Sequence, residues 1–168
     1  LLAFDTLEAA LQARDLIVRS TLQPAAVDLA NPAATASLGD RVPQGWLLVV
    51  DAGGIEAVLA RYDRNLKHVA REAAAREFAA LESEQATDLW RRLRDFPALS
   101  GEGGPMGLRP TKGDEDAVGR ARGTNELERV FNGAVLRVST TLARLGEAFG
   151  AAPDLPALAR AASGIVYI

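Results

Sequence analysis

The sequence predicts an α+β fold: a ferredoxin-like antiparallel sheet with helices on one face, extended by an extra strand-helix-strand unit. Two observations lead to it. Short apolar runs alternate with amphipathic helical segments in split units, an order that builds antiparallel sheets with packed helices. The 168 residues, 48% of them hydrophobic, are enough for one core. We therefore expect a single domain over residues 1–168.

The first split unit opens with an apolar strand at residues 1–4. Asp5 is expected to cap the following helix, with Glu8 as its capping-box partner. The helix is expected to reach about Arg19, and a return strand follows at residues 25–29. Apolar residues recur at helical spacing in this helix: Leu7, Ala10, Leu11, Ile17 and Val18.

The second unit contains the strongest strand, the unbroken apolar run at residues 46–50. Before it, the polar, Gly- and Pro-containing residues 33–44 predict a loop. After it, residues 51–54 turn the chain into a helix with apolar residues on one face: Ile55, Val58, Leu59, Tyr62, Leu66 and Val69. Residues 77–81 are interpreted as a short strand that closes the unit.

A further helix is expected to begin at Ser83, an N-cap residue type, and to end before Pro97. It presents Leu89, Trp90 and Leu93 on one stripe. Residues 99–133 combine a glycine-rich part with a charge-dense part, which predicts a long, mobile loop.

The last unit is predicted to consist of a strand at residues 134–139, a helix at 142–149 and a strand at 164–168. Because the chain begins and stops inside apolar runs, we expect it to be a fragment of a longer protein. It would then act together with segments outside these residues.

Composition excludes several classes of function. The formal net charge of −3 gives no electrostatic reason to expect a nucleic-acid partner. The absence of cysteine excludes disulfides, thiolate metal sites and a cysteine nucleophile. No apolar run is long enough for a transmembrane segment, and no export signal opens the chain. A cytoplasmic location is compatible with these features.

Several motifs recur in an order that points to a known family. Phe4-Asp5-Thr6-Leu7-Glu8 is followed by a return strand ending in Asp28-Leu29, and Leu89-Trp90 is followed by Arg94. Later come Leu136-Arg137-Val138-Ser139 and a closing Gly164-led strand. The chain resembles the cap, or substrate, domain of FAD-linked oxidases of the vanillyl-alcohol-oxidase type. Within that family it is most similar to the FAD-binding subunit of glycolate oxidase.

This resemblance implies a set of partners. FAD would be bound by a flavin-binding domain of the same protein that is absent from this chain. The substrate would be a small 2-hydroxy acid such as glycolate or D-lactate, and other oxidase subunits would be further partners. The chain alone is expected to be inactive. The alternative is a non-catalytic ferredoxin-like module that binds a ligand or another protein, since such folds host many functions.

Arg137 and Arg94 are the candidate substrate-binding residues, because a guanidinium fork matches a carboxylate. For each, an ordinary surface arginine is the competing interpretation. Catalytic residues remain unknown, and we expect neither cofactor-binding residues nor a metal site in this chain. His68 is the only histidine, and its neighbours favour a solvated side chain. Trp90 shares the stripe of Leu93, which favours a core position over a substrate wall.

Two glycine clusters are candidate anion sites. Residues 101–107 lack the Lys-Ser/Thr and the strand-to-helix context of a phosphate-binding loop, so a flexible linker is favoured. Gly53-Gly54 follows a strand and precedes a helix, but Asp51 would repel an anion there. A tight turn is the favoured interpretation.

Overall fold

The computed structural model describes residues 1–39, 42–81, 83–99 and 136–168. Within these residues one antiparallel sheet has seven strands in the order β4-β1-β3-β2-β6-β7-β5. The strands are β1 (Leu2–Phe4), β2 (Ala26–Ala30), β3 (Trp46–Asp51), β4 (Glu77–Phe78), β5 (Arg137–Ser139), β6 (Leu158–Arg160) and β7 (Ile165–Tyr167). The helical elements are α1 (Leu7–Arg19), α2 (Pro32–Ser37), α3 (Glu56–Glu72), α4 (Ser83–Leu99), a 3-10 turn (Leu142–Arg144) and α7 (Leu145–Gly150).

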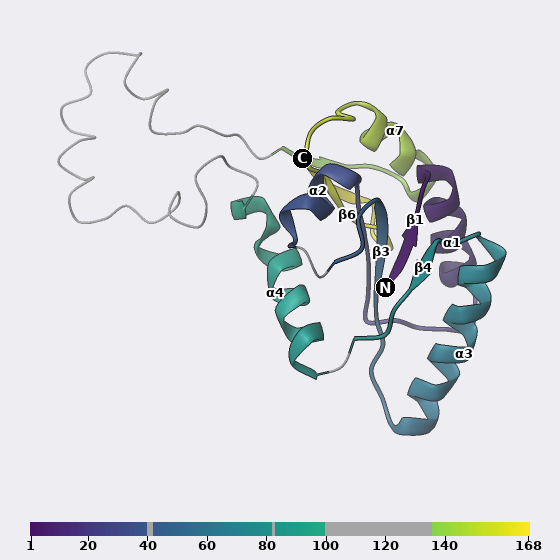
Figure 1. The fold of residues 1–168 in the computed structure, drawn as a ribbon. Coiled ribbons are helices and arrows are strands. Elements are labelled where there is room, and N and C mark those ends of the chain that lie inside the picture. Colours follow the sequence, from purple (N-terminus) through teal and green to yellow (C-terminus); the bar gives the residue numbers. More distant parts are fainter. Residues whose placement is uncertain (40–41, 82, 100–135) are drawn as a thin grey trace, which may run out of the picture.

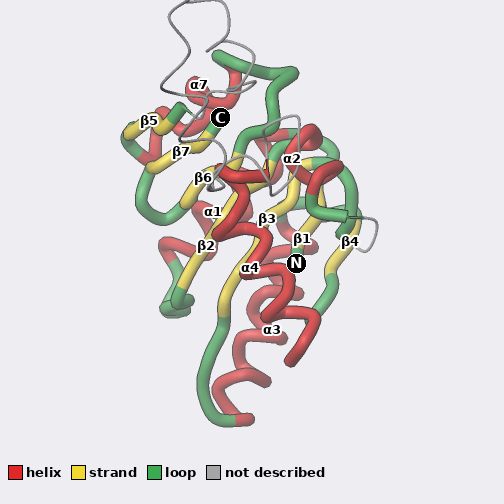
Figure 2. The backbone as a smooth tube through the Cα atoms, turned by 90° about the vertical axis from the view of Figure 1, so that its left-hand side faces the viewer, coloured by secondary structure: helices red, strands yellow, loops and turns green. Residues whose placement is uncertain are grey.

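The N-terminal part is a ferredoxin-like layer. Strands β1 and β2 flank α1, strands β3 and β4 flank α3, and the four strands lie in the order β4-β1-β3-β2. This is the arrangement of a split βαβ pair, and the predicted α+β class and antiparallel sheet are confirmed. The extension continues from the other side of β2 with β6, β7 and β5 (Figure 2).

Helices cover both faces of this sheet, not one as predicted. Alternate strand residues such as Leu2, Phe4 and Leu48 share one apolar cluster with residues of α1, α3 and α7. The residues between them, such as Ala3 and Leu47, join a second cluster with residues of α2 and α4. Figure 2 shows α4 crossing in front of the sheet, with α1 and α3 behind it. We call the second side of the sheet the α4 face.

The two-sided cover explains the unbroken apolar run of β3. In a strand, successive side chains point to opposite faces, so Leu48 packs towards α1 while Leu47 and Val49 pack towards α4. A strand buried on both faces needs apolar residues at every position. The apolar run indicates only that β3 is buried on both faces. It does not say which helix covers the second face, so the sequence alone did not place α4.

The cap of α1 differs from the prediction. The side chain of Thr6, not that of Asp5, occupies the N-cap and accepts a hydrogen bond from the Ala9 amide at 3.2 Å. Asp5 lies one residue too early and instead pairs with Arg76 beyond α3, with 2.8 Å between Nη1 and Oδ1. The helix itself ends at Arg19 as predicted.

Two elements were not predicted. Helix α2 overlaps the expected loop 33–44, and β6 lies between the predicted helix 142–149 and the predicted strand 164–168. The buried Asn31 joins them: its Oδ1 accepts from the amides of Ala34 and Ala157, and its Nδ2 donates to the Leu155 carbonyl. One side chain thus caps α2 and holds the entry of β6.

Helix α3 buries only the second half of its predicted stripe. Tyr62, Leu66 and Val69 are buried, but Ile55 is 74% exposed, and Val58 and Leu59 are exposed as well. The N-terminal half of α3 extends beyond the sheet, as Figure 1 shows, so no strand lies beneath it.

The two elements after α3 have other bounds than predicted. Strand β4 has only the residues Glu77 and Phe78, although backbone hydrogen bonds between Leu1 and Ala79 prolong the pairing. Helix α4 continues past Pro97 to Leu99. A proline so near the helix end removes one backbone donor without interrupting a long segment after it.

The C-terminal part follows the prediction more closely. A 3-10 turn and α7 cover the predicted helix 142–149, and β7 lies within the predicted strand 164–168. Gly164 has φ +73°, and a Cβ there would lie 2.1 Å from the Thr140 carbonyl oxygen, so the turn into β7 requires glycine. The predicted loop 99–133 lies outside the described residues, apart from its first residue at the end of α4.

Candidate functional site

Arg137 lies on the last strand of the described sheet and points to the α4 face. Among the strands that the structure describes, its strand, β5, pairs only with β7. Val138 packs against the cluster of α1 and α3, so its neighbours Arg137 and Ser139 must point the other way. Both are exposed. Among the described residues, Arg137 has no ion-pair or hydrogen-bond partner.

Tyr167 on β7 stands directly opposite Arg137. The pairs Leu136–Ile168 and Thr140–Gly164 carry the backbone hydrogen bonds of this ladder. Bonded and non-bonded pairs alternate along antiparallel strands, so Arg137 and Tyr167 form a non-hydrogen-bonded pair. Side chains approach each other most closely at such pairs.

The next row on the same face is formed by Ser139 and Ile165. We call Arg137, Ser139, Ile165 and Tyr167 the β5–β7 face. It contains one cation, two hydroxyls and one apolar side chain, and no carboxylate. It can therefore receive a small anion that also carries a hydroxyl group, since the guanidinium provides a fork for a carboxylate and the hydroxyls donate or accept.

Sequence reasoning offered Arg137 as a candidate and did not single out Tyr167. The closing segment was interpreted as a strand, yet nothing in it showed which earlier residue its tyrosine would face. The alternation of β7 could have placed Tyr167 and Ile165 on one face. The partner strand could not have been read from the sequence, because β7 pairs with β5 and also with the unpredicted β6.

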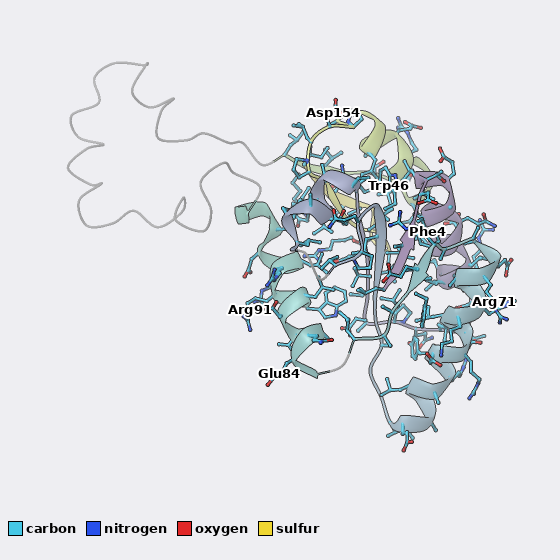
Figure 3. The ribbon with its side chains drawn as sticks, viewed as in Figure 1. Phe4, Trp46, Arg71, Glu84, Arg91 and Asp154 are labelled. Carbon is cyan, nitrogen blue, oxygen red and sulfur yellow. The ribbon has the colours of Figure 1, made fainter. Side chains whose placement is uncertain are left out.

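Arg94 lies on α4 and is not part of this face. Its side chain is 72% exposed, and its Nε lies 3.3 Å from Oδ1 of the adjacent Asp95. Leu93, the preceding residue, is buried against the sheet, so Arg94 emerges at the side of the helix. Figure 3 shows Arg91, on the same helix, projecting away from the sheet. No contact among the described residues joins Arg94 to Arg137.

The remaining residues named in the sequence analysis, Trp90, His68 and Gly53-Gly54, lie outside the β5–β7 face. Trp90 is half-buried against the α4-face cluster, as expected for a core position. The side chain of His68 is 69% exposed, with Nε2 3.4 Å from Oε2 of Glu72. In the described part of the chain no group of three metal-ligating side chains is found. Gly53 and Gly54 form the turn into α3, with φ +140° at Gly54.

A buried ion pair lies further along the α4 face. Asp28 on β2 is 1% exposed and accepts a hydrogen bond from Nη1 of Arg160, directly opposite on β6. Nη2 of Arg160 lies 3.5 Å from the Leu93 carbonyl of α4. Burial raises the pKa of the Asp28 carboxyl to about 6, and the attraction of Arg160 opposes this shift without cancelling it.

This pair ties α4 to the sheet and was not predicted. Arg160 stands directly opposite Ile165 of the β5–β7 face, but its guanidinium is engaged by Asp28 and α4. In the sequence, Asp28 stands out only as part of the family-like ending Asp28-Leu29. A single acidic residue in an otherwise apolar strand was the available signal for a buried pair.

A groove of about 790 Å³ lies on the other side of α4. It is lined by Leu38 and Gly39 after α2, Leu81 before α4, and Asp88 and Arg92 on α4, among others. Arg92 is engaged there by Asp88 at 2.9 Å and by the Leu38 carbonyl at 2.9 Å. Arg92 is therefore neutralised by Asp88, and the groove is also lined by the acidic Glu84, so among the described residues it is less suited to a carboxylate than the surroundings of Arg137.

Comparison with family models gives one match. The model of FAD linked oxidases, C-terminal domain, matches residues 1–114 of the 168. The chain is a member of this family. Neither the curated proteins nor the solved structures gave a match.

The range matched by the FAD-linked oxidase model corresponds to one part of the fold. Among the described residues it covers β1 to α4, that is the ferredoxin-like layer and the helix with Arg94. Arg137 and Tyr167 lie beyond it, in the extension of the sheet. Within the described residues no helix is long and apolar enough to cross a membrane.

FAD is the cofactor of this family, and the chain is the C-terminal domain only. In its described residues, the strand-to-helix junction at Gly53-Gly54 is the place closest in form to a phosphate cradle. The half-exposed Asp51 stands beside that junction, which is unfavourable for a diphosphate. The family implies that a flavin-binding domain of the same protein holds the cofactor. The described residues therefore show no cradle for the flavin diphosphate.

Proposed function

We propose that this domain is the substrate-covering cap of an FAD-dependent oxidoreductase that oxidises a small 2-hydroxy acid such as glycolate or D-lactate. The β5–β7 face would lie over the flavin and receive the substrate. The resemblance of its sequence motifs to the FAD-binding subunit of glycolate oxidase supports this substrate class. Other oxidase subunits would then complete the enzyme.

One observation carries the proposal: in a domain of the FAD-linked oxidase family, the exposed guanidinium of Arg137 stands on a sheet face without a partner among the residues that the structure describes. Most other arginines in the described part of the chain have a partner, as Arg160, Arg144 and Arg92 do. Arg137 instead stands beside hydroxyl groups without a carboxylate on its face. A substrate carboxylate would complete this arrangement.

The chemical roles divide between cofactor and chain. Held by the flavin-binding domain, FAD would supply the acceptor for the two electrons that oxidation of the alcohol carbon releases. The residues of this chain bind and orient. Arg137 would hold both carboxylate oxygens in a fork, and half-buried Ile165 would exclude water beside the reacting carbon. A fixed orientation of this kind lowers the activation barrier, because the translational and rotational entropy is already lost when the substrate binds.

The test uses the full-length protein that contains this domain. It should purify with flavin absorbance or take up FAD on reconstitution. Under anaerobic conditions, glycolate or D-lactate should bleach the flavin, whereas acetate and propionate, which lack the hydroxyl group, should not. A full-length protein that can bind no flavin would refute the proposal, and so would a flavin that no 2-hydroxy acid reduces. The alternative of a non-catalytic module is not favoured by membership of this family.

A further inference from the structure

The ring of Tyr167 is packed against other side chains, whereas its hydroxyl forms no hydrogen bond with another described residue. The ring is half-buried and packs against the α4-face cluster, which also contains its other cross-strand neighbour, Leu158. Among the described residues, its hydroxyl has no hydrogen-bond partner. The chain's other tyrosine, Tyr62, is different, because its hydroxyl accepts a hydrogen bond from the Gln23 amide at 3.1 Å.

A half-buried tyrosine usually satisfies its hydroxyl. Within the described ranges, neither the hydroxyl of Tyr167 nor the guanidinium of Arg137 has a hydrogen-bond partner, and the two residues occupy the closest kind of cross-strand position. Packing of the ring limits the positions that the hydroxyl can take. We therefore expect the guanidinium fork of Arg137 and the hydroxyl of Tyr167 to be within reach of the same small ligand.

We propose that Tyr167 is a specificity-determining residue whose hydroxyl forms a hydrogen bond with the 2-hydroxyl group of the substrate while Arg137 holds the carboxylate. This inference rests on the proposed function and deepens it. In a 2-hydroxy acid the hydroxyl is on the carbon next to the carboxyl group. One small molecule can therefore reach both neighbouring side chains.

The substrate hydroxyl is assigned to Tyr167 because the other polar groups of the substrate already have a partner. A bidentate guanidinium occupies both carboxylate oxygens, which leaves the substrate hydroxyl as the remaining polar group. A phenol can donate to or accept from it. A site that engages a substrate hydroxyl discriminates against analogues that lack it, because its own polar group is then left unpaired.

The experiment compares two matched ligand pairs in the full-length holoenzyme. Glycolate and D-lactate carry the hydroxyl, and acetate and propionate lack it. Dissociation constants of the hydroxy acids come from the concentration dependence of anaerobic flavin reduction. Those of the plain acids come from perturbation of the flavin absorbance. Tyr167→Phe should weaken hydroxy-acid binding about tenfold, the effect of one lost hydrogen bond, and leave plain-acid binding within about twofold.

Two variants serve as controls. Tyr62→Phe makes the same chemical change on the opposite side of the sheet and should alter neither ligand class. Arg137→Lys should weaken both classes together, because both carry the carboxylate. Flavin content and the thermal unfolding midpoint check that Tyr167→Phe is folded.

The possible failures are distinguishable. If Tyr167→Phe weakens both ligand classes equally, or neither, this inference is overturned while the proposed function stands. If the parent protein is not reduced by either hydroxy acid, the proposed function fails and this inference fails with it.

Discussion

Arg137 and Arg94 differ in how firmly the fold directs their side chains. A strand paired along its length fixes the direction of Arg137, whereas Arg94 emerges from the exposed side of a helix and already pairs with Asp95. Preorganised groups bind with less loss of freedom. We therefore expect Arg137 to contribute more to substrate handling than Arg94.

Replacement of each arginine by lysine tests this ranking in the full-length enzyme. Arg137→Lys keeps the charge but removes the planar fork, so the KM for the 2-hydroxy acid should rise about tenfold. Flavin content and folding should be unchanged. Arg94→Lys should behave like the parent. The reverse ranking in steady-state kinetics would transfer the role to Arg94, and loss of folding in Arg137→Lys would indicate a structural role.

Asp28 gives the domain an unusual pH dependence. Burial raises its pKa from the ordinary 3.8 to about 6. Between about pH 4 and 6 the folded state therefore keeps a proton that the unfolded chain has released. The stability from this group is fully present below about pH 4 and is lost as the pH rises through 6, which is opposite to the usual behaviour of an aspartate.

Asp28→Asn should remove this contribution, since the amide still accepts from Arg160 but does not titrate. As the pH rises from 4 to 7, the parent should lose about 2–3 kcal/mol of unfolding free energy relative to the variant. Urea unfolding at a series of pH values measures the difference. Parallel pH profiles would show that Asp28 is ionised throughout this range.

At the scale of elements, Asn31 determines where α2 begins and where β6 joins the sheet. Asn31→Ala leaves the amides of Ala34 and Ala157 without their acceptor and the Leu155 carbonyl without its donor. Unsatisfied buried groups are costly, so we expect a loss of about 3 kcal/mol in unfolding free energy. Denaturant unfolding provides the measurement.

Thr6→Ala is the matched control for Asn31→Ala. Thr6 also caps a helix, but its hydrogen bond to Ala9 is exposed to solvent, so its loss should cost about 1 kcal/mol. Equal losses for the two variants would contradict a connecting role for Asn31. They would leave it as an ordinary helix cap.

At the scale of the whole molecule, the domain is expected to depend on a flavin-binding domain for its cofactor. Residues 1–168 alone should not bind FAD tightly, because the described residues form no cradle for a diphosphate. Calorimetric titration of the isolated chain with FAD should give no stoichiometric binding. A tight one-to-one isotherm would place cofactor-binding residues in this chain.

The helices and strands with a strong local pattern were predictable from the sequence. The stripe of α1, the apolar run of β3 and the order of split units were enough for the α+β class. Elements without such a pattern were missed. Helix α2 has six residues with little apolar periodicity, and β6 has three residues in a segment that contains Pro153 and Pro156. Both depend on Asn31, whose partners are up to 126 residues away.

By itself, the sequence determined the elements with a strong local pattern and the fold class, and it offered Arg137 and Arg94 as candidates that stay predictions. Only the tertiary structure decided that helices cover both faces, that Arg160 is engaged by Asp28, and that Tyr167 faces Arg137. The physical reason lies in register: periodicity is a property of neighbours along the chain, whereas cross-strand partners depend on how distant strands pair. A shift of one residue between β5 and β7 would have sent Tyr167 to the opposite face from Arg137.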